Sequence, residues 1–129
     1  MTTDLACLVA SALWGLGLTF FEVGAKTRVA GVAWNRGNRD TQPKVPAWVD
    51  RAGRALANHK ENFPLFLTAV VVAHLLGKND GVVAIACIAF VVARALHGIV
   101  YIAGIEGVRS LLFVAGIGAV LTIFARCFL

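Results

Sequence analysis

Four stretches of apolar residues constrain the fold of this chain more than any other feature. They cover residues 5–21, 62–77, 81–105 and 110–125, and Arg94 in the third is the only charged residue within them. A membrane-spanning helix needs about 20 mostly apolar residues, with a range of roughly 17–25. The first and third stretches reach that length, and the other two reach it with their polar flanks. Because the period-2 alternation of a β-barrel is absent, we expect helices that cross a membrane.

The composition agrees with an integral membrane protein of one domain. Of the 129 residues, 59% are hydrophobic and only 15% are charged. A soluble protein of this size could not bury so much apolar surface in one core. The expected fold is therefore all-α: an integral membrane four-helix bundle with up-down-up-down connections. Its single domain, residues 1–129, has expected spans at 4–24, 52–77, 80–104 and 107–128. A cleaved signal peptide is the rival interpretation of the first span, but Asp4 stands where such a peptide carries positive charge.

The net charge of +5 is concentrated between the first and second spans. The basic residues there are Lys26, Arg28, Arg36, Arg39, Lys44, Arg51 and Arg54. The positive-inside rule then places the loop at 25–51 in the cytoplasm and both chain ends on the other side of the membrane. Topology alone explains this charge, and the loop has no nucleic-acid-binding motif, so no nucleic-acid partner is expected. The short chain and the lack of a retention signal favour a bacterial inner membrane.

The three cysteines, Cys7, Cys87 and Cys127, indicate neither a metal site nor a redox motif. None has C-x-x-C spacing, and no histidine lies at metal-ligand spacing from them. We interpret them as small apolar side chains within or at the ends of the spans. No metal is expected.

Two polar stripes enter the apolar spans. The stripe of the second span has residues spaced 3, 4 and 3 apart: Arg51, Arg54, Asn58 and Glu61. At 100° per residue they fall within an arc of roughly 80° on one helix face. The stripe of the third span has spacings of 3 and 4: Arg94, His97 and Tyr101. A charge such as Arg94 at that depth costs at least about 2.5–3.5 kcal/mol, so it should face the bundle and meet a partner, for which Glu61 is the expected carboxylate.

Each of these residues also has a purely structural interpretation. Arg51 and Arg54 would be topology signals at a helix end, and Glu61 with Arg94 would be an ion pair that locks two helices. His97 would be a core histidine and Tyr101 an interface aromatic. Glu22, near the end of the first span, would pair with Lys26 four residues later.

Taken together, the stripes favour a binding pocket. Arg109 begins the fourth span, and Lys26 and Arg28 follow the first, so several helices bring cations to the same membrane level. Arginine binds carboxylates through two parallel hydrogen bonds. A pocket for a small anionic, peptide-like molecule is therefore expected, with Asn58 for an amide and Glu61 for an ammonium group.

At these residues the chain resembles the MAPEG family, the membrane-associated proteins in eicosanoid and glutathione metabolism. The resemblance rests on the pattern R-x-x-x-N-x-x-E at 54–61, followed by the run F-P-L-F-L at 63–67. It also rests on A-R-A-L-H-G-I-V-Y-I-A-G at 93–104, followed by V-R-S at 108–110. The similarity covers nearly the whole chain. The chain length, the four spans and the polar first loop also agree with the family.

The resemblance implies a homotrimer that binds glutathione between neighbouring protomers, near the cytoplasmic face. By motif position, Arg54, Asn58, Glu61, Arg94 and Tyr101 would bind glutathione, with Lys26 or Arg28 as the basic residue that ends the first span. His97 stands where the leukotriene-forming branch has a tyrosine. Arg109 would match the arginine that stabilises the thiolate, although its spacing from Tyr101 is one residue longer. Asn62 also replaces a tyrosine of that branch.

The implied chemistry is a glutathione-dependent transferase or peroxidase acting on a hydrophobic electrophile from the membrane lipid. Arg109, and after it Arg28, would be the catalytic residues, because a guanidinium favours the thiolate. One alternative is a non-catalytic lipid- or glutathione-binding protein of the same fold. Another is a small four-span multidrug transporter that uses Glu22, although that carboxylate lies at the end of its span.

Overall fold

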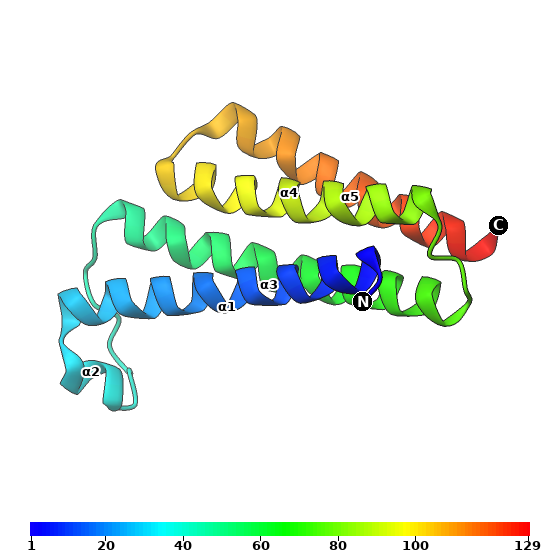
Figure 1. Cartoon of the computed structure of the whole chain (residues 1–129). Helices are drawn as coiled ribbons and strands as arrows, with labels where there is room; N and C mark the ends of the chain where they lie inside the picture. Colours follow the sequence, from blue (N-terminus) through cyan, green and yellow to red (C-terminus); the bar gives the residue numbers. More distant parts are fainter.

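The computed structural model describes residues 1–129 and contains helices but no strands, which confirms the expected all-α class. The helices are α1 (Thr3–Ala30), α2 (Val32–Arg36), α3 (Ala47–Leu75), α4 (Gly81–Ala103) and α5 (Glu106–Phe128). The four long helices run alternately in opposite directions, so both chain ends lie toward one end of the molecule. The link that contains α2 lies at the other end (Figure 1).

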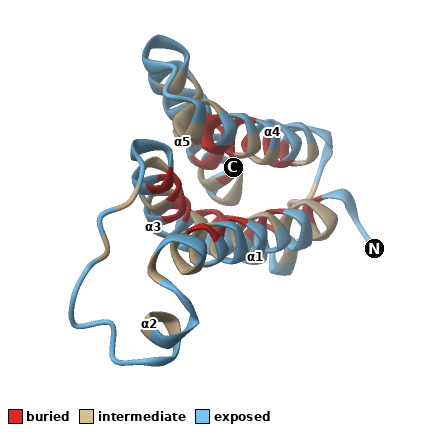
Figure 2. Cartoon of the chain, turned by 90° about the vertical axis from the view of Figure 1, so that its left-hand side faces the viewer, coloured by how far each residue is buried: buried red, intermediate tan, exposed pale blue.

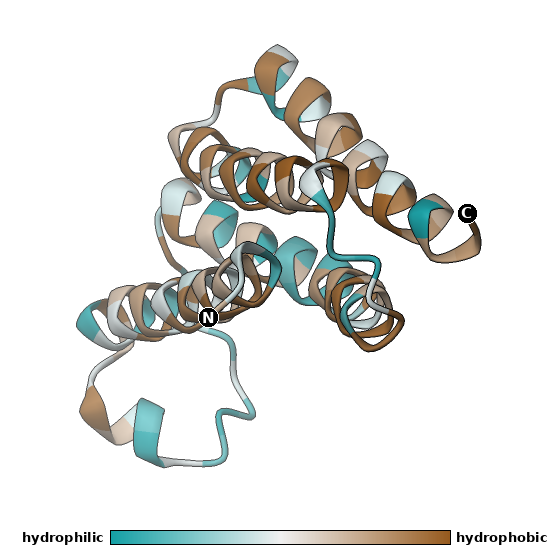
Figure 3. Ribbon diagram, turned by 45° about the vertical axis from the view of Figure 1, so that its right-hand side comes forward, coloured by the Kyte–Doolittle hydropathy of each residue, from teal (hydrophilic) through white to brown (hydrophobic).

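Three helices, α1, α4 and α5, are long and apolar enough to cross a membrane. Their outer faces expose large apolar side chains such as Leu13, Ile85 and Leu121, which are 61%, 71% and 62% exposed. This is the pattern of helices that face lipid. The second expected span, which is α3, does not meet the same measure, because polar residues fill its first half. These polar residues appear in teal along α3, in contrast to the largely brown α4 (Figure 3).

The link between the first two long helices is shorter than the loop expected at 25–51. Helix α1 continues to Ala30 and ends at Gly31, whose positive φ of 87° suits glycine. Helix α3 begins at Ala47, directly after Pro46. Between them, the Trp34 indole Nε1 donates a hydrogen bond of 2.7 Å to the Thr41 carbonyl and so closes the link on itself.

Helices α3 and α4 form the centre of the molecule. Each packs against the other, against α1 and against α5, whereas α1 and α5 do not contact each other. Buried residues, in red, gather on the facing sides of the long helices (Figure 2). The rings of Phe66 and Phe90 stack with 4.0 Å between centroids. In lipid such packing stabilises by van der Waals contact rather than by exclusion of water.

Polar contacts tie the helices together at the end that carries the termini. The His74 imidazole on α3 lies 2.8 Å from the buried Asp4 carboxylate on α1. Asp80 caps α4 by accepting hydrogen bonds from the backbone N–H groups of Val82 and Val83, and Arg126 on α5 pairs with the same carboxylate. The Val83 N–H and the Arg126 guanidinium lower the pKa of the exposed Asp80 carboxyl.

Candidate functional site

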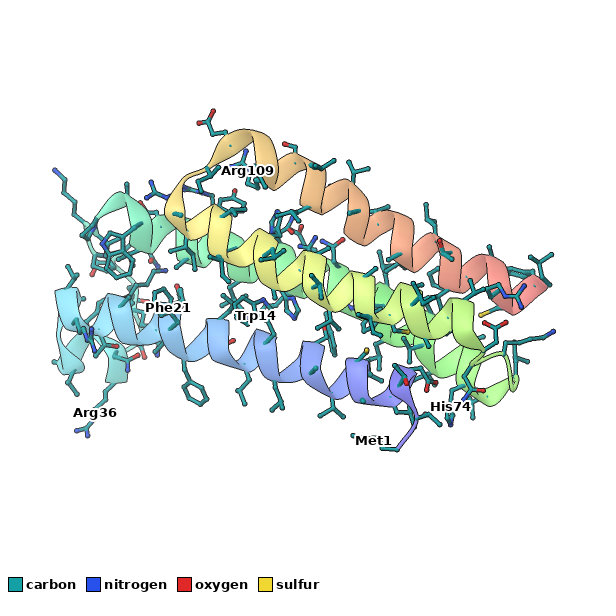
Figure 4. All side chains as sticks on the ribbon, turned by 45° about the horizontal axis from the view of Figure 1, so that its top comes forward. Met1, Trp14, Phe21, Arg36, His74 and Arg109 are labelled. Carbon is teal, nitrogen blue, oxygen red and sulfur yellow. The ribbon has the colours of Figure 1, made fainter.

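A cleft of about 260 Å³ opens between α3, α4 and α5, near the end that carries α2. Its lining residues are Asn58, His97, Tyr101, Arg109, Ser110, Phe113 and Val114. Four of the residues singled out from the sequence therefore meet in one place. They do so because His97 and Tyr101 are one turn apart on α4, and because Arg109 stands one turn before Phe113 on the facing side of α5. Figure 4 shows Arg109 at the opposite end of the molecule from Met1 and His74.

Arg94 supplies a buried guanidinium beside this cleft. The residue is only 2% exposed, and its Nη2 donates a hydrogen bond to the Asn58 Oδ1 of α3. Its Cζ lies 5.8 Å from the ring centre of Phe113. The Nε and Nη1 nitrogens have no partner in the protein. A buried cation with free N–H donors is costly, so these nitrogens are suited to receive an anionic ligand.

The expected ion pair between Arg94 and Glu61 is not formed, and this prediction was wrong. Glu61 is exposed, and the Arg94 guanidinium instead donates a hydrogen bond to the amide oxygen of Asn58. Asn58 lies one turn earlier in the same stripe, at a helix angle that points toward α4. A neutral amide leaves the positive charge of Arg94 uncompensated within the protomer.

Arg109 lies on the face of an aromatic ring. Its Cζ is 4.7 Å from the ring centre of Tyr101, close enough for a cation–π interaction. The Tyr101 ring in turn meets the His97 ring edge to face, with 5.5 Å between centroids. Tyr101 thus contacts both a guanidinium and an imidazole, and all three residues line the same cleft.

The other predicted site residues lie outside the cleft of a single protomer. Arg54 and Glu61 are exposed on α3. Arg28 is also exposed and lines a separate hollow of about 190 Å³ beside Phe21 and Trp48. Lys26 forms an ion pair of 2.6 Å with Glu22, as its spacing predicted.

Arg51 has a structural role within the protomer. Its Nε donates a hydrogen bond of 2.9 Å to the Ile102 carbonyl, and its guanidinium packs over Gly104. It therefore closes the C-terminal end of α4, where a cation is favourable. This role is structural, but it differs from the topology signal considered above.

The chain was compared with known proteins. The model of the MAPEG family matches residues 4–129. This chain belongs to the MAPEG family. No curated protein and no solved structure matched it. The family match agrees with the apolar helices and supports an integral membrane protein whose function is related to glutathione.

Sequence reasoning missed three residues that line the cleft of this MAPEG protein: Ser110, Phe113 and Val114. Phe113, four residues after Arg109, could have been found because it shares that helix face, whereas the spacing gives no such signal for Ser110 or Val114. Sequence reasoning did not single out His59 either. This residue is buried, and its Nε2 lies 3.1 Å from the Ser11 carbonyl oxygen. No group of three or more His, Cys, Asp or Glu side chains is placed to hold a metal ion.

Proposed function

We propose that this MAPEG protein is a glutathione-dependent membrane enzyme that conjugates or reduces hydrophobic electrophiles. The observation that carries the proposal is the cleft lined by Arg109, Asn58 and Tyr101, with the buried Arg94 guanidinium behind it, hydrogen-bonded to Asn58. A site with one arginine and no carboxylate in its lining, and a second arginine buried beside it, suits an anion. Glutathione carries two carboxylates, two amides and a thiol, and these groups match the donors and acceptors present.

Binding would use the groups that the protomer leaves unpaired. The Nε and Nη1 of Arg94 have no partner in the protein and would each offer a single donor to a carboxylate of glutathione, since Nη2, which lies parallel to each of them, is held by Asn58. Asn58 keeps its side-chain N–H₂ free for a peptide carbonyl while its oxygen holds Arg94. Both residues are fixed by packing, so little freedom is lost when the ligand binds.

We propose that a neighbouring protomer completes the site in a homotrimer. A cleft of about 260 Å³ is small for a tripeptide, since ligand sites usually enclose about 300–1,000 Å³. The exposed Arg54, Glu61 and Arg28 carry charges that nothing in their own chain neutralises. Packed against the cleft of a neighbour, they would supply further contacts to the carboxylates and the ammonium group of glutathione, with Lys26 nearby at the end of α1.

The proposed mechanism is stabilisation of the thiolate by Arg109. A free thiol has a pKa of about 8.5, so only a few per cent is ionised at neutral pH. A shift of two pKa units, which one close guanidinium can supply in a partly desolvated site, raises the thiolate fraction substantially and corresponds to about 2.7 kcal/mol. Phe113 and Val114 form the apolar side of the cleft, where an electrophile dissolved in lipid could approach the sulfur.

The test is the substitution Arg109→Ala in the purified protein in detergent. We expect turnover of an aromatic electrophile to fall by about 10–100-fold, because the thiolate loses its cation. Glutathione affinity, measured by calorimetry, should change far less. Arg36→Ala is the matched control, since Arg36 is exposed on α2, outside the cleft.

Two outcomes would contradict the proposal in different ways. Unchanged turnover in Arg109→Ala would remove this arginine from the mechanism. Binding of glutathione by the unmodified protein without conjugation of any of several electrophiles, and without peroxide reduction, would favour the non-catalytic alternative.

A further inference from the structure

His97 differs from the other buried histidine of the molecule. It is only 3% exposed and lines the cleft. Neither of its ring nitrogens makes a hydrogen bond within the protein, yet neither is among the fully buried unpaired polar atoms. The little surface that His97 exposes therefore includes its nitrogens. His59, by contrast, is engaged through Nε2 with the Ser11 carbonyl of α1.

The packing around His97 fixes the plane of its ring. Tyr101 meets it edge to face at 5.5 Å, and Phe113 lies at 6.4 Å on the α5 side. These aromatic contacts offer no hydrogen bond to the nitrogens. The imidazole is thus positioned by apolar walls while its polar atoms face the cleft, which is the arrangement of a group that acts on a ligand rather than on the fold.

The charged and titratable groups near this imidazole come from two helices. Arg94 and Tyr101 belong to α4, and Arg109 belongs to α5. From α3 the cleft receives Asn58, which does not titrate, and from α1 the nearest contact is Trp14 against Gly98. No carboxylate lines this cleft. His97 is the only side chain of the lining whose ordinary pKa lies near neutrality.

We infer that His97 is the base that takes the proton from the thiol of bound glutathione. This inference rests on the function proposed above. The S–H bond breaks and its electron pair stays on sulfur, while a new N–H bond forms on the neutral imidazole. The sulfur becomes a thiolate beside Arg109, and the imidazolium then gives its proton to water at the cleft opening. The net reaction releases one proton per thiolate, and no oxidant or reductant is needed.

The free-energy cost of this proton transfer follows from the pKa values of the thiol and the imidazole. An ordinary imidazole has a pKa of about 6.5 and is mostly neutral at pH 7, and an ordinary thiol has a pKa of about 8.5. From these ordinary values the transfer is uphill by about two pKa units. Arg109 reduces this cost by stabilising the thiolate, whereas Arg94 and Arg109 both disfavour the imidazolium, so the proton would pass on to water rather than stay on the ring. Arg109 would stabilise the thiolate, and His97 would make its formation faster.

The experiment mixes glutathione rapidly with the full-length protein and follows the ultraviolet absorbance of the thiolate, with a pH indicator to follow proton release. We expect His97→Gln to slow thiolate formation by about 100-fold at neutral pH, as removal of a general base does. Glutathione affinity and the final thiolate level should remain. His74→Gln, which removes a histidine at the far end of the molecule, is the matched control.

A second variant guards against a merely structural effect. In His97→Ala, added imidazole should restore the rate of thiolate formation if the ring acts as a base. Thiolate formation at the unmodified rate in His97→Gln, or a loss that imidazole does not restore in His97→Ala, would overturn the inference while leaving the proposed function intact. Absence of thiolate in the unmodified protein with glutathione bound would overturn both.

Discussion

At the scale of single residues, the burial of Arg94 depends on a glycine of the neighbouring helix. A Cβ atom at Gly116 would lie 3.1 Å from the Arg94 Cδ and 3.6 Å from its Nη1. The guanidinium reaches Asn58 because α5 has no side chain at this point. A glycine lowers the stability of its helix, but at this position it leaves room for the Arg94 side chain.

We predict that Gly116→Ala weakens glutathione binding by about tenfold, the value of one charge-assisted hydrogen bond at about 1.5 kcal/mol. The added methyl would push the Arg94 side chain aside and misalign its free nitrogens. Calorimetry in detergent measures the change. Gly118→Ala, on the same helix with nothing within 4 Å, should bind as the unmodified protein does. Equal affinity in both variants would argue against Arg94 as a ligand-binding residue.

Helix spacing predicts the position of a side chain better than it predicts the partner. Asn58, His97 and Tyr101 could be placed on inward faces from their spacing along α3 and α4, and the structure brings them together with Arg109 in one cleft. The partner of Arg94 could not be predicted. Choosing between Asn58 and Glu61 requires the rotation of α3 against α4, which depends on packing over the full length of both helices.

At the scale of whole helices, two close contacts fix α1 against the centre of the molecule. His59 of α3 lies against Gly15 of α1, where an added Cβ would be only 2.8 Å from the imidazole. Trp14 of α1 lies against Gly98 of α4, where an added Cβ would be 3.0 Å from the indole. Small residues that let membrane helices approach closely are a general device of helix packing in lipid.

We predict that Gly15→Ala destabilises the protein by about 1–3 kcal/mol, because the methyl group would overpack the contact with His59. The measurement is thermal unfolding in detergent. Gly17→Ala is the control, since no atom lies within 4 Å of the corresponding position. A melting temperature of Gly15→Ala equal to that of the control would show that α1 moves away from α3 without cost.

The helices themselves were easier to predict than their ends. Apolar stretches and their polar flanks located all four long helices. The predicted helix ends differ from the structure mainly at the polar link, where α1 continues to Ala30 and the short α2 follows. Hydropathy marks where a chain leaves the apolar phase, whereas a helix continues until a residue such as Gly31 changes the backbone direction.

At the scale of the whole molecule, the proposed site draws on two chains. Asn58 lines the cleft, whereas Arg54 and Glu61 of the same helix stripe are exposed outside it. In a threefold assembly each interface is heterologous, so one chain would supply Arg109 while its neighbour supplies Arg54. Residues that look unrelated in a single chain would then act on the same glutathione.

We predict that two impaired variants, Arg109→Ala and Arg54→Ala, recover part of the lost activity when they are expressed together. Random mixing gives an unmodified site at about one interface in four. The measurement is turnover of the co-purified mixture, compared with each variant alone. Proteins that are purified separately and combined without exchange of subunits are the control. No recovery in mixed trimers would mean that a single chain supplies both arginines.

The polar half of α3 also constrains how the protein enters a bilayer. The hydropathy of this helix is too low to qualify as a span, whereas α1 and α4 qualify on their own. Only a short turn separates α3 from α4. We therefore expect α1 to insert into the bilayer first. Helices α3 and α4 would then insert together as a hairpin, in which the apolar α4 makes insertion of the polar α3 favourable. The polar α3 residues that are proposed to bind glutathione are thus the ones that make insertion a cooperative event.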